Sequence, residues 1–232
     1  MIKQITEPFE PWDIFSARVL AAHRSYDDAQ FWMQDESSAI SLVDGFAIFA
    51  AKENADWEEL IAFLQMQPWR RLQCSADVAE KLPFPIKWHS MQLRFVALKK
   101  EFDHDNIVPA SDPSEVYDIL ARCFPDMKNR NDWMADLALR WRRGTAKSWI
   151  IEGMCTVSAI AMSENYAFLG AVGTVPEARG KGLAGRLLAY AAEEMSGREV
   201  WLSCREELQG LYESIGFERA GDMITLRKEG DA

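Results

Sequence analysis

The sequence is poor in the residues that build metal sites and disulfide frameworks. The four cysteines form no CxxC pair and no cluster: Cys74, Cys123, Cys155 and Cys204. The three histidines show no metal-ligand spacing: His23, His89 and His104. We therefore expect reduced, mostly buried thiols and no bound metal.

Long apolar runs are also missing. No run approaches the roughly 18–20 residues needed to span a bilayer, and the N-terminal MIKQITEPFEPWD lacks the apolar stretch of a signal peptide. These absences predict a cytoplasmic protein without a membrane partner.

Positive charge is in deficit. Lys and Arg number 26 against 36 Asp and Glu, which gives a formal net charge of −10. This field repels a phosphate backbone, so nucleic acid is a poor partner, whereas an amine-bearing substrate would be attracted. Apolar residues make up 48% of the 232 residues, enough for the cores of two small domains.

The first half alternates helical and strand patterns. Asp44-Gly45 separates two apolar runs, and this dipeptide favours two-residue hairpin turns because both positions need positive φ. Asp56, with Glu59 three residues later, resembles a capping box at a helix start. The expected elements are a helix over 11–23, strands over 39–43, 46–51 and 69–74, a helix from 56, and a last strand and linker ending near 106.

The second half begins with Asp112-Pro113-Ser114-Glu115, which places a cap, a proline and an acid at a helix start. Apolar periodicity then predicts the following elements. They are a helix from 112 and another over about 131–141, strands over 148–151, 155–162 and 166–175, a helix over 182–195, a strand over 199–204, a short helix over 206–215 and a strand over 217–226.

The order helix, hairpin, helix, strand and short helix thus occurs twice. We interpret this as a tandem pseudo-repeat of residues 1–106 and 107–232. Sequence identity between the halves is negligible, so the interpretation depends on element order alone, and a chance resemblance is the alternative.

The most informative segment, residues 173–185, lies between a strand and a helix. Gly180 and Gly182 let the backbone approach a ligand with its N–H groups turned inward, and the helix start adds partial positive charge. Arg179 and Lys181 add cations, while the GK[ST] ending of a P-loop and a full GxGxxG are both absent. The pattern indicates a pyrophosphate-binding site; an ordinary glycine-containing turn is the alternative.

Two motifs in this half resemble the GNAT superfamily of acyl-CoA-dependent N-acetyltransferases. Arg179, Gly182 and Ala184 match its Arg/Gln-x-x-Gly-x-Gly/Ala signature, and LYESIGF over 211–217 looks like its LYxxxGF segment. The resemblance implies an α/β (α+β) GNAT fold, with a mixed, mostly antiparallel sheet flanked by helices. With the repeat, it implies two GNAT-like halves, the N-terminal one degenerate.

The resemblance also implies a site for acetyl-CoA as cosubstrate. In the family, a strand that splays from its neighbour pairs with the pantetheine arm, and amides at the following helix start hold the pyrophosphate. The matching positions are Gly173, Thr174, Val175, Arg179, Gly180, Lys181, Gly182, Leu183 and Ala184.

Tyr212 matches the tyrosine that faces the thioester sulfur and acts as general acid in the family. A core aromatic, four residues after Leu208, is the alternative. Many members place a carboxylate base on the splayed strand, but residues 167–173 contain none. Glu152, Glu164 and Glu206 fit better as surface acids, so the base stays unassigned.

These observations predict an N-acetyltransferase that transfers acetyl from acetyl-CoA to a primary amine of a small molecule or peptide by direct attack. The alternatives are a different acyl donor or an acyl-CoA-binding regulatory module without turnover. The N-terminal half offers acids at Glu53, Asp56 and Glu58 in place of a glycine loop, so we expect no nucleotide there. Acceptor identity and oligomeric state stay open.

Overall fold

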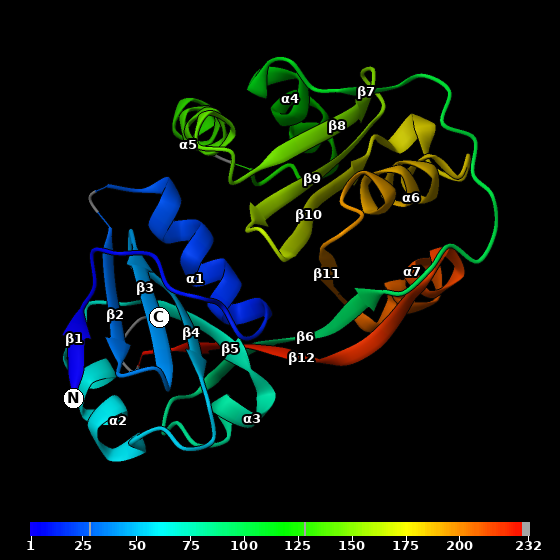
Figure 1. The fold of residues 1–232 in the computed structure, drawn as a ribbon. Coiled ribbons are helices and arrows are strands. Elements are labelled where there is room, and N and C mark those ends of the chain that lie inside the picture. Colours follow the sequence, from blue (N-terminus) through cyan, green and yellow to red (C-terminus); the bar gives the residue numbers. More distant parts are fainter. Residues whose placement is uncertain (28, 128, 229–232) are drawn as a thin grey trace. The chain divides into compact units, whose positions relative to one another are not determined.

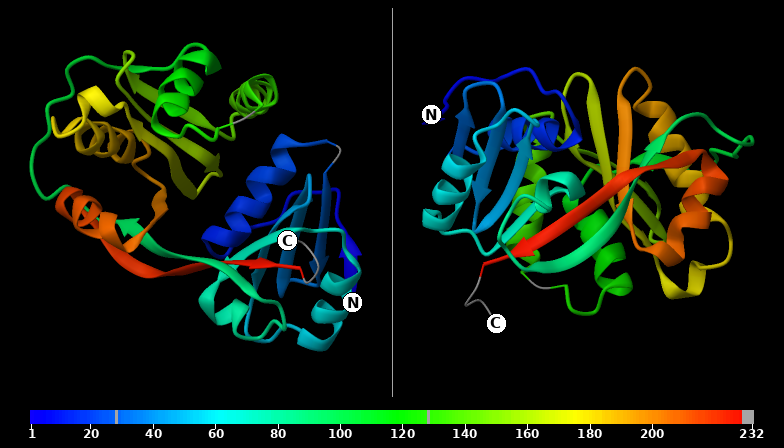
Figure 2. Two further views of the ribbon diagram at one scale, coloured as in Figure 1. Left: turned by 180° about the vertical axis from the view of Figure 1, so that it is seen from behind. Right: turned by 90° about the horizontal axis from the view of Figure 1, so that it is seen from below.

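The computed structural model describes residues 1–27, 29–127 and 129–228. The chain forms two compact units (Figures 1 and 2), one made of residues 1–92 with 220 onward and the other of residues 93–219. Strands β6 (Ile86–Phe95) and β12 (Phe217–Arg227) each contribute residues to both units. The predicted domain boundary between residues 106 and 107 refers to the repeat of element order in the sequence, not to these two units, and it stays a prediction.

Unit 1 is a layered α/β structure. Its further elements are β1 (Ile2–Gln4), α1 (Ile14–Ser25), β2 (Gln30–Gln34), β3 (Ser38–Val43), β4 (Phe46–Ala51), α2 (Trp57–Met66), β5 (Arg71–Ser75) and α3 (Ala76–Ala79). The strands follow the order β1, β2, β3, β4, β5, β12; the β4–β5 pair is parallel and the others are antiparallel. Helix α1 covers one sheet face, while α2 and α3 pack on the other.

Local sequence signals explain several boundaries in unit 1. Asp44 and Gly45 adopt φ of 49° and 77°, which confirms the expected hairpin turn between β3 and β4. Asp56 caps α2 by accepting from the Glu59 backbone N–H at 3.1 Å. The Glu59 side chain does not complete a capping box, because it accepts instead from the Ile2 backbone N–H at 2.8 Å.

Unit 2 repeats this element order with one additional helix after its first strand. Its elements are β7 (Ile107–Pro109), α4 (Pro113–Cys123), α5 (Arg130–Arg142), β8 (Lys147–Ile151), β9 (Cys155–Met162), β10 (Tyr166–Thr174), the short 3-10 turns η1 (Pro176–Ala178) and η2 (Glu206–Leu208), α6 (Leu183–Glu194), β11 (Glu199–Cys204) and α7 (Gln209–Ile215). The strand order is β7, β8, β9, β10, β11, and only β10–β11 is parallel.

Helices α4 and α6 both pack on the β8–β10 sheet. Helix α4 begins with the expected proline at its first turn, and Asp112 and Glu115 form a reciprocal capping box. The core of unit 2 includes Trp149, Leu187 and Phe217, each fully buried.

The predicted fold class is confirmed as a mixed, mainly antiparallel sheet flanked by helices. Sequence patterns missed β1, β2 and β7, because β1 and β7 have only three residues each and β2, whose two faces are both partly buried, has no apolar alternation. No helix among the described residues is long and apolar enough to cross a membrane.

Candidate active site

Strands β10 and β11 pair in parallel only over the first four residues of each. Their register extends from Tyr166 opposite Glu199 to Leu169 opposite Leu202, and it ends there. Beyond Leu169, β10 continues for five residues to Thr174 while it stays paired with β9 on its other side. The two strands therefore separate midway, which leaves one edge of β10 open to a ligand.

A bulge in β10 accompanies this separation. Ala171 has φ of +49°, a left-handed conformation that is uncommon for a residue with a Cβ, and the β9 register shifts between Gly170 and Gly173. Bulges bend a strand and redirect its backbone groups. Nothing in the sequence signals this bulge, because the left-handed residue is an alanine.

Gly173 lies next to helix α4. A Cβ at this position would lie 3.0 Å from Leu120 Cδ2 and 3.1 Å from Cys123 Sγ. The glycine therefore allows α4 to pack closely on the open part of β10, and a larger residue would require the Leu120 and Cys123 side chains to shift.

The loop after β10 turns through two left-handed glycines. Gly180 and Gly182 have φ of +76° and +73°, and a Cβ on either would meet no protein atom within 4 Å. Gly182 occupies the N-cap position of α6, so no side chain caps that helix. The first backbone N–H groups of α6 have no intrahelical partner, and an uncapped helix start of this kind suits an anion.

The structure brings the predicted loop residues together at the start of α6. Gly180, Lys181 and Arg179 are exposed or lie at the loop surface, whereas the side chain of Leu183 is buried and anchors the helix. Arg179 Nε donates to the Thr174 carbonyl at 3.2 Å, which ties the cation to the end of β10. Ala184 is partly buried in the first helical turn.

Val175 differs from its neighbours in its backbone bonding. Its N–H donates to the Met154 carbonyl at 2.9 Å, and its carbonyl accepts from the Ala178 N–H at 2.9 Å. The Val175 N–H is therefore not available to a ligand in this conformation. Backbone groups alternate between the two edges of a strand, so the N–H of Gly173 faces β9 as that of Val175 does, and Thr174 is the neighbouring position that faces the open edge.

Tyr212 lies in α7 and is buried, with 5% of its surface exposed. Its ring packs edge-on against Phe217 at 6.1 Å between centroids. Burial, together with the neighbouring Cys204 thiol group, raises the pKa of Tyr212 to about 12. The hydroxyl therefore keeps its proton throughout the physiological range.

Cys204 ends β11, two residues after the pairing with β10 stops. Its thiol is near enough to Tyr212 to contribute to the raised pKa of that phenol. Burial, and secondarily Glu213, raises the pKa of the Cys204 thiol to about 11. A thiol of this kind is a poor nucleophile at neutral pH, in agreement with a packing role.

Gly216 explains the glycine of the LYESIGF segment. It adopts φ of +137°, and a Cβ there would overlap the carbonyl oxygen of Ala97. The backbone is fixed on both sides, because Val96 N–H donates to the Gly216 carbonyl and Lys99 N–H donates to the Ile215 carbonyl, each at 3.0 Å. This close approach orients α7, which carries Tyr212.

Arg186 adds a contact that the sequence patterns do not predict. From the second turn of α6, its guanidinium donates to the backbone carbonyls of Asp103 and Asp105 at 2.8 Å each, and it pairs with the Asp103 carboxylate at 2.9 Å. The segment before β7 is thereby held against α6. No sequence signal marks it, because the acceptors are backbone atoms.

The three acids considered as bases are all exposed: Glu152, Glu164 and Glu206. Within the described residues, no three His, Cys, Asp or Glu side chains gather as metal ligands would.

Comparison with known proteins agrees with this geometry. Residues 145–219 match the family model of the acetyltransferase (GNAT) domain. Among curated proteins, no sequence matches this chain. The matched segment holds β8 to α7, and so it contains both the separating strands and the α6 loop.

Solved structures share the fold over nearly the whole chain. A GCN5-related N-acetyltransferase from Kribbella flavida has a TM-score of 0.67 at 16% identity, covering 94% of this chain and 95% of its own. A GNAT-family acetyltransferase from Colwellia psychrerythraea has a TM-score of 0.56 at 13% identity, covering 99% and 100%. A tandem GNAT protein from the clavulanic acid biosynthesis pathway has a TM-score of 0.60 at 11% identity, covering 97% and 90%.

The architecture is therefore that of a GNAT-fold protein. Its segment 145–219 is similar to the acetyltransferase (GNAT) domain, and this similarity supports a transferase.

Proposed function

We propose that this chain is an acetyl-CoA-dependent N-acetyltransferase that acetylates a primary amine of a small molecule or peptide. The observation that carries the proposal is the separation of β10 from β11 directly before the uncapped start of α6. An extended thioester arm fits along the open edge of β10, and its pyrophosphate fits at the N–H groups of residues 180–184. Arg179 and Lys181 supply nearby positive charge.

The chemistry follows from these positions. The neutral amine attacks the thioester carbonyl, so a C–N bond forms and the C–S bond breaks without a covalent enzyme intermediate. A backbone N–H near Val172 or Gly173 stabilises the developing oxyanion. Tyr212 donates a proton to the departing thiolate, and water carries away the proton that the amine loses.

Water is the proposed proton acceptor because the strand residues 167–173 include no carboxylate and the acids considered as bases are exposed. An aliphatic amine with a pKa of about 10 is mostly protonated at neutral pH. Turnover should therefore increase with pH as the fraction of free amine increases.

The test is a screen of the full chain with acetyl-CoA and a panel of primary amines, read as thiol release and as product mass. Acetylated amine with equimolar CoA supports the proposal. Acetyl-CoA binding without turnover of any amine would instead indicate an acyl-CoA-binding regulatory module. Turnover only with longer acyl thioesters would show that the donor is not acetyl-CoA.

A further inference from the structure

Unit 1 contains a cavity of 480 Å³, a size typical of small-molecule sites. All of its lining residues belong to unit 1: Asp44, Gly45, Phe46, Arg70, Arg71, Lys87 and Arg227. Four of the seven are cationic in a chain whose formal net charge is −10. The cavity is thus opposite in sign to the protein that carries it.

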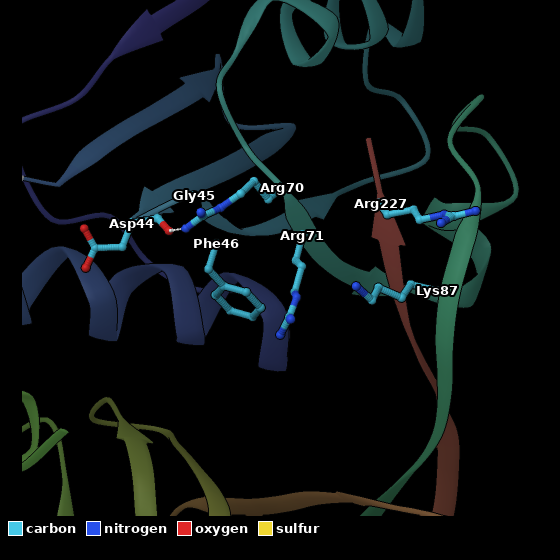
Figure 3. Close-up of a pocket in the computed structure, with 7 residues that line it drawn as sticks. All are labelled: Asp44, Gly45, Phe46, Arg70, Arg71, Lys87 and Arg227. Atoms are coloured by element: carbon cyan, nitrogen blue, oxygen red, sulfur yellow. Dashed lines mark hydrogen bonds between the residues drawn. The ribbon is translucent and has the colours of Figure 1, made fainter. Parts of the chain in front are cut away.

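The cations come from neighbouring strands in register. Phe46 on β4 pairs with Arg71 on β5, and Arg71 pairs with Arg227 on β12. Strand β6 lies next to β12 in the sheet and contributes Lys87. The residue before β6 is held to β12 because the Arg227 N–H donates to the Pro85 carbonyl at 2.9 Å. These three cations are exposed and line the same cavity as the Phe46 ring, and Figure 3 shows the Arg227 side chain extending away from Arg71 and Lys87.

Arg71 and Arg227 lie directly opposite each other in an antiparallel pair. Side chains in such pairs point to the same sheet face, with Cβ atoms about 4.5–5.5 Å apart, and like charges there are destabilising. Among the described residues, neither arginine forms an ion pair with a carboxylate that would offset the repulsion. A bound anion would remove this cost.

Trp88 draws two of these cations together. The Arg71 guanidinium lies 5.0 Å and the Lys87 ammonium 4.9 Å from the centroid of its half-exposed indole ring. Figure 3 shows Lys87 extending toward Arg71, while the carboxylate of Asp44 points away from both. Arg70 has another task, because its Nη2 donates to the Asp44 carbonyl at 2.9 Å and supports the hairpin turn.

We propose that this cavity is a second ligand site, which binds a small molecule carrying a multiply charged phosphate group through Arg71, Lys87 and Arg227. Phosphate suits the site because two guanidinium groups offer bidentate donors to its oxygens. Phe46, which lines the cavity, supplies apolar surface for the rest of the molecule.

This site differs from the nucleotide position that the sequence excludes. The acids at Glu53, Asp56 and Glu58 follow the C-terminal end of β4, whereas Phe46 lies at its N-terminal end. The two ends of this six-residue strand are separated by about 17–20 Å. The proposed site is also independent of the acetyl-transfer proposal, since all residues of that site lie in unit 2.

Calorimetric titration of the full chain with sodium tripolyphosphate at low ionic strength tests the proposal. The variant R71Q/R227Q should bind about tenfold more weakly or worse, because two charge-assisted contacts are lost. The matched control K3Q/K52Q removes the same charge from unit 1, from the far edge strand and from the other end of β4, and should bind like the wild type. Equal weakening in the control would overturn the assignment.

Arginine labelling with phenylglyoxal, read peptide by peptide, shows whether tripolyphosphate binds at this cavity or only at the proposed pyrophosphate site of unit 2. Tripolyphosphate should slow modification of Arg71 and Arg227 and leave exposed Arg142 unchanged. The thermal midpoint of R71Q/R227Q should equal or exceed that of the wild type, since an opposed pair of like charges is removed. Unprotected arginines, or a clearly lower midpoint, would overturn the proposal.

Two further ligands define its chemistry. Citrate should bind more weakly than tripolyphosphate. If citrate binds equally well or more tightly, the site would be one for a polycarboxylate and the phosphate proposal would be wrong. Binding of an acidic peptide or an oligonucleotide without any binding of tripolyphosphate would refute a small-molecule site.

Discussion

Gly216 faces the carbonyl oxygen of Ala97 so closely that no side chain can be built on its Cα. The contact joins the end of α7 to the segment that follows β6, and both belong to unit 2. The glycine of the LYESIGF segment is therefore a packing requirement that positions Tyr212.

Replacing Gly216 by alanine should destabilise the protein by at least about 2 kcal/mol, because a Cβ meets backbone and φ is +137°. Gly210 is the matched control in the same helix, since a Cβ there meets nothing within 4 Å. Gly210→Ala should be neutral or stabilise by about 0.5–1 kcal/mol. Chemical denaturation of the two variants checks the opposite signs; equal effects would refute the packing role.

Much of this fold follows from the sequence, and the exceptions have physical reasons. Asp44-Gly45, the Asp112 cap and the strand over 199–204 are predictable because turn chemistry and apolar periodicity are local. The bulge at Ala171 depends on tertiary packing, which leaves no local pattern in the sequence. The same is true of β6 and β12, each of which contributes residues to both units.

The candidate site divides in the same way. Gly182 and Tyr212 can be located from the sequence, because each belongs to a short motif with fixed spacing. The Arg186 contacts to backbone carbonyls are not predictable, because the position of a loop decides them. The same holds for the Arg71–Arg227 pair of the separate cavity in unit 1, which depends on strand register. The roles of the motif residues stay predictions until the variants are measured.

If Tyr212 is the general acid, Tyr212→Phe should lower kcat by about 10²–10³ and leave acetyl-CoA affinity nearly unchanged, since only a transition-state interaction is removed. Steady-state turnover, measured beside the thermal midpoint, checks this. A core aromatic without catalytic duty would instead give wild-type kcat. If Tyr212→Phe also lowers the thermal midpoint, a stabilising substitution such as Gly210→Ala is added to it. A restored midpoint with kcat still low would show that the loss of rate is catalytic and does not come from folding.

The pKa of Tyr212 sets the alkaline behaviour. Because burial raises this pKa to about 12, the phenol stays protonated to at least about pH 10, so the rate should rise with pH without an alkaline limb from Tyr212 below that value. A rate that falls between about pH 8 and 9 in the wild type, and not in Tyr212→Phe, would contradict this.

The same shift predicts a stability change with a definite sign. The folded pKa of Tyr212 lies above the unfolded value of about 10, so between about pH 10 and 12 the unfolded state loses its proton first. The contribution is fully present below pH 10 and is lost as pH rises to 12, on the order of 2 kcal/mol. Denaturation across this range should show a steeper loss for the wild type than for Tyr212→Phe.

The central claim is that the start of α6 holds the pyrophosphate of acetyl-CoA, and calorimetric titration of paired glycine variants tests it most directly. Gly182 and Gly197 lie at opposite ends of α6, both have positive φ, and a Cβ on either meets no protein atom within 4 Å. Glutamate therefore costs similar strain at each position, but only at Gly182 does it put a carboxylate where the pyrophosphate should lie. We predict that Gly182→Glu abolishes acetyl-CoA binding and that Gly197→Glu retains wild-type affinity; unchanged affinity in Gly182→Glu would contradict the account.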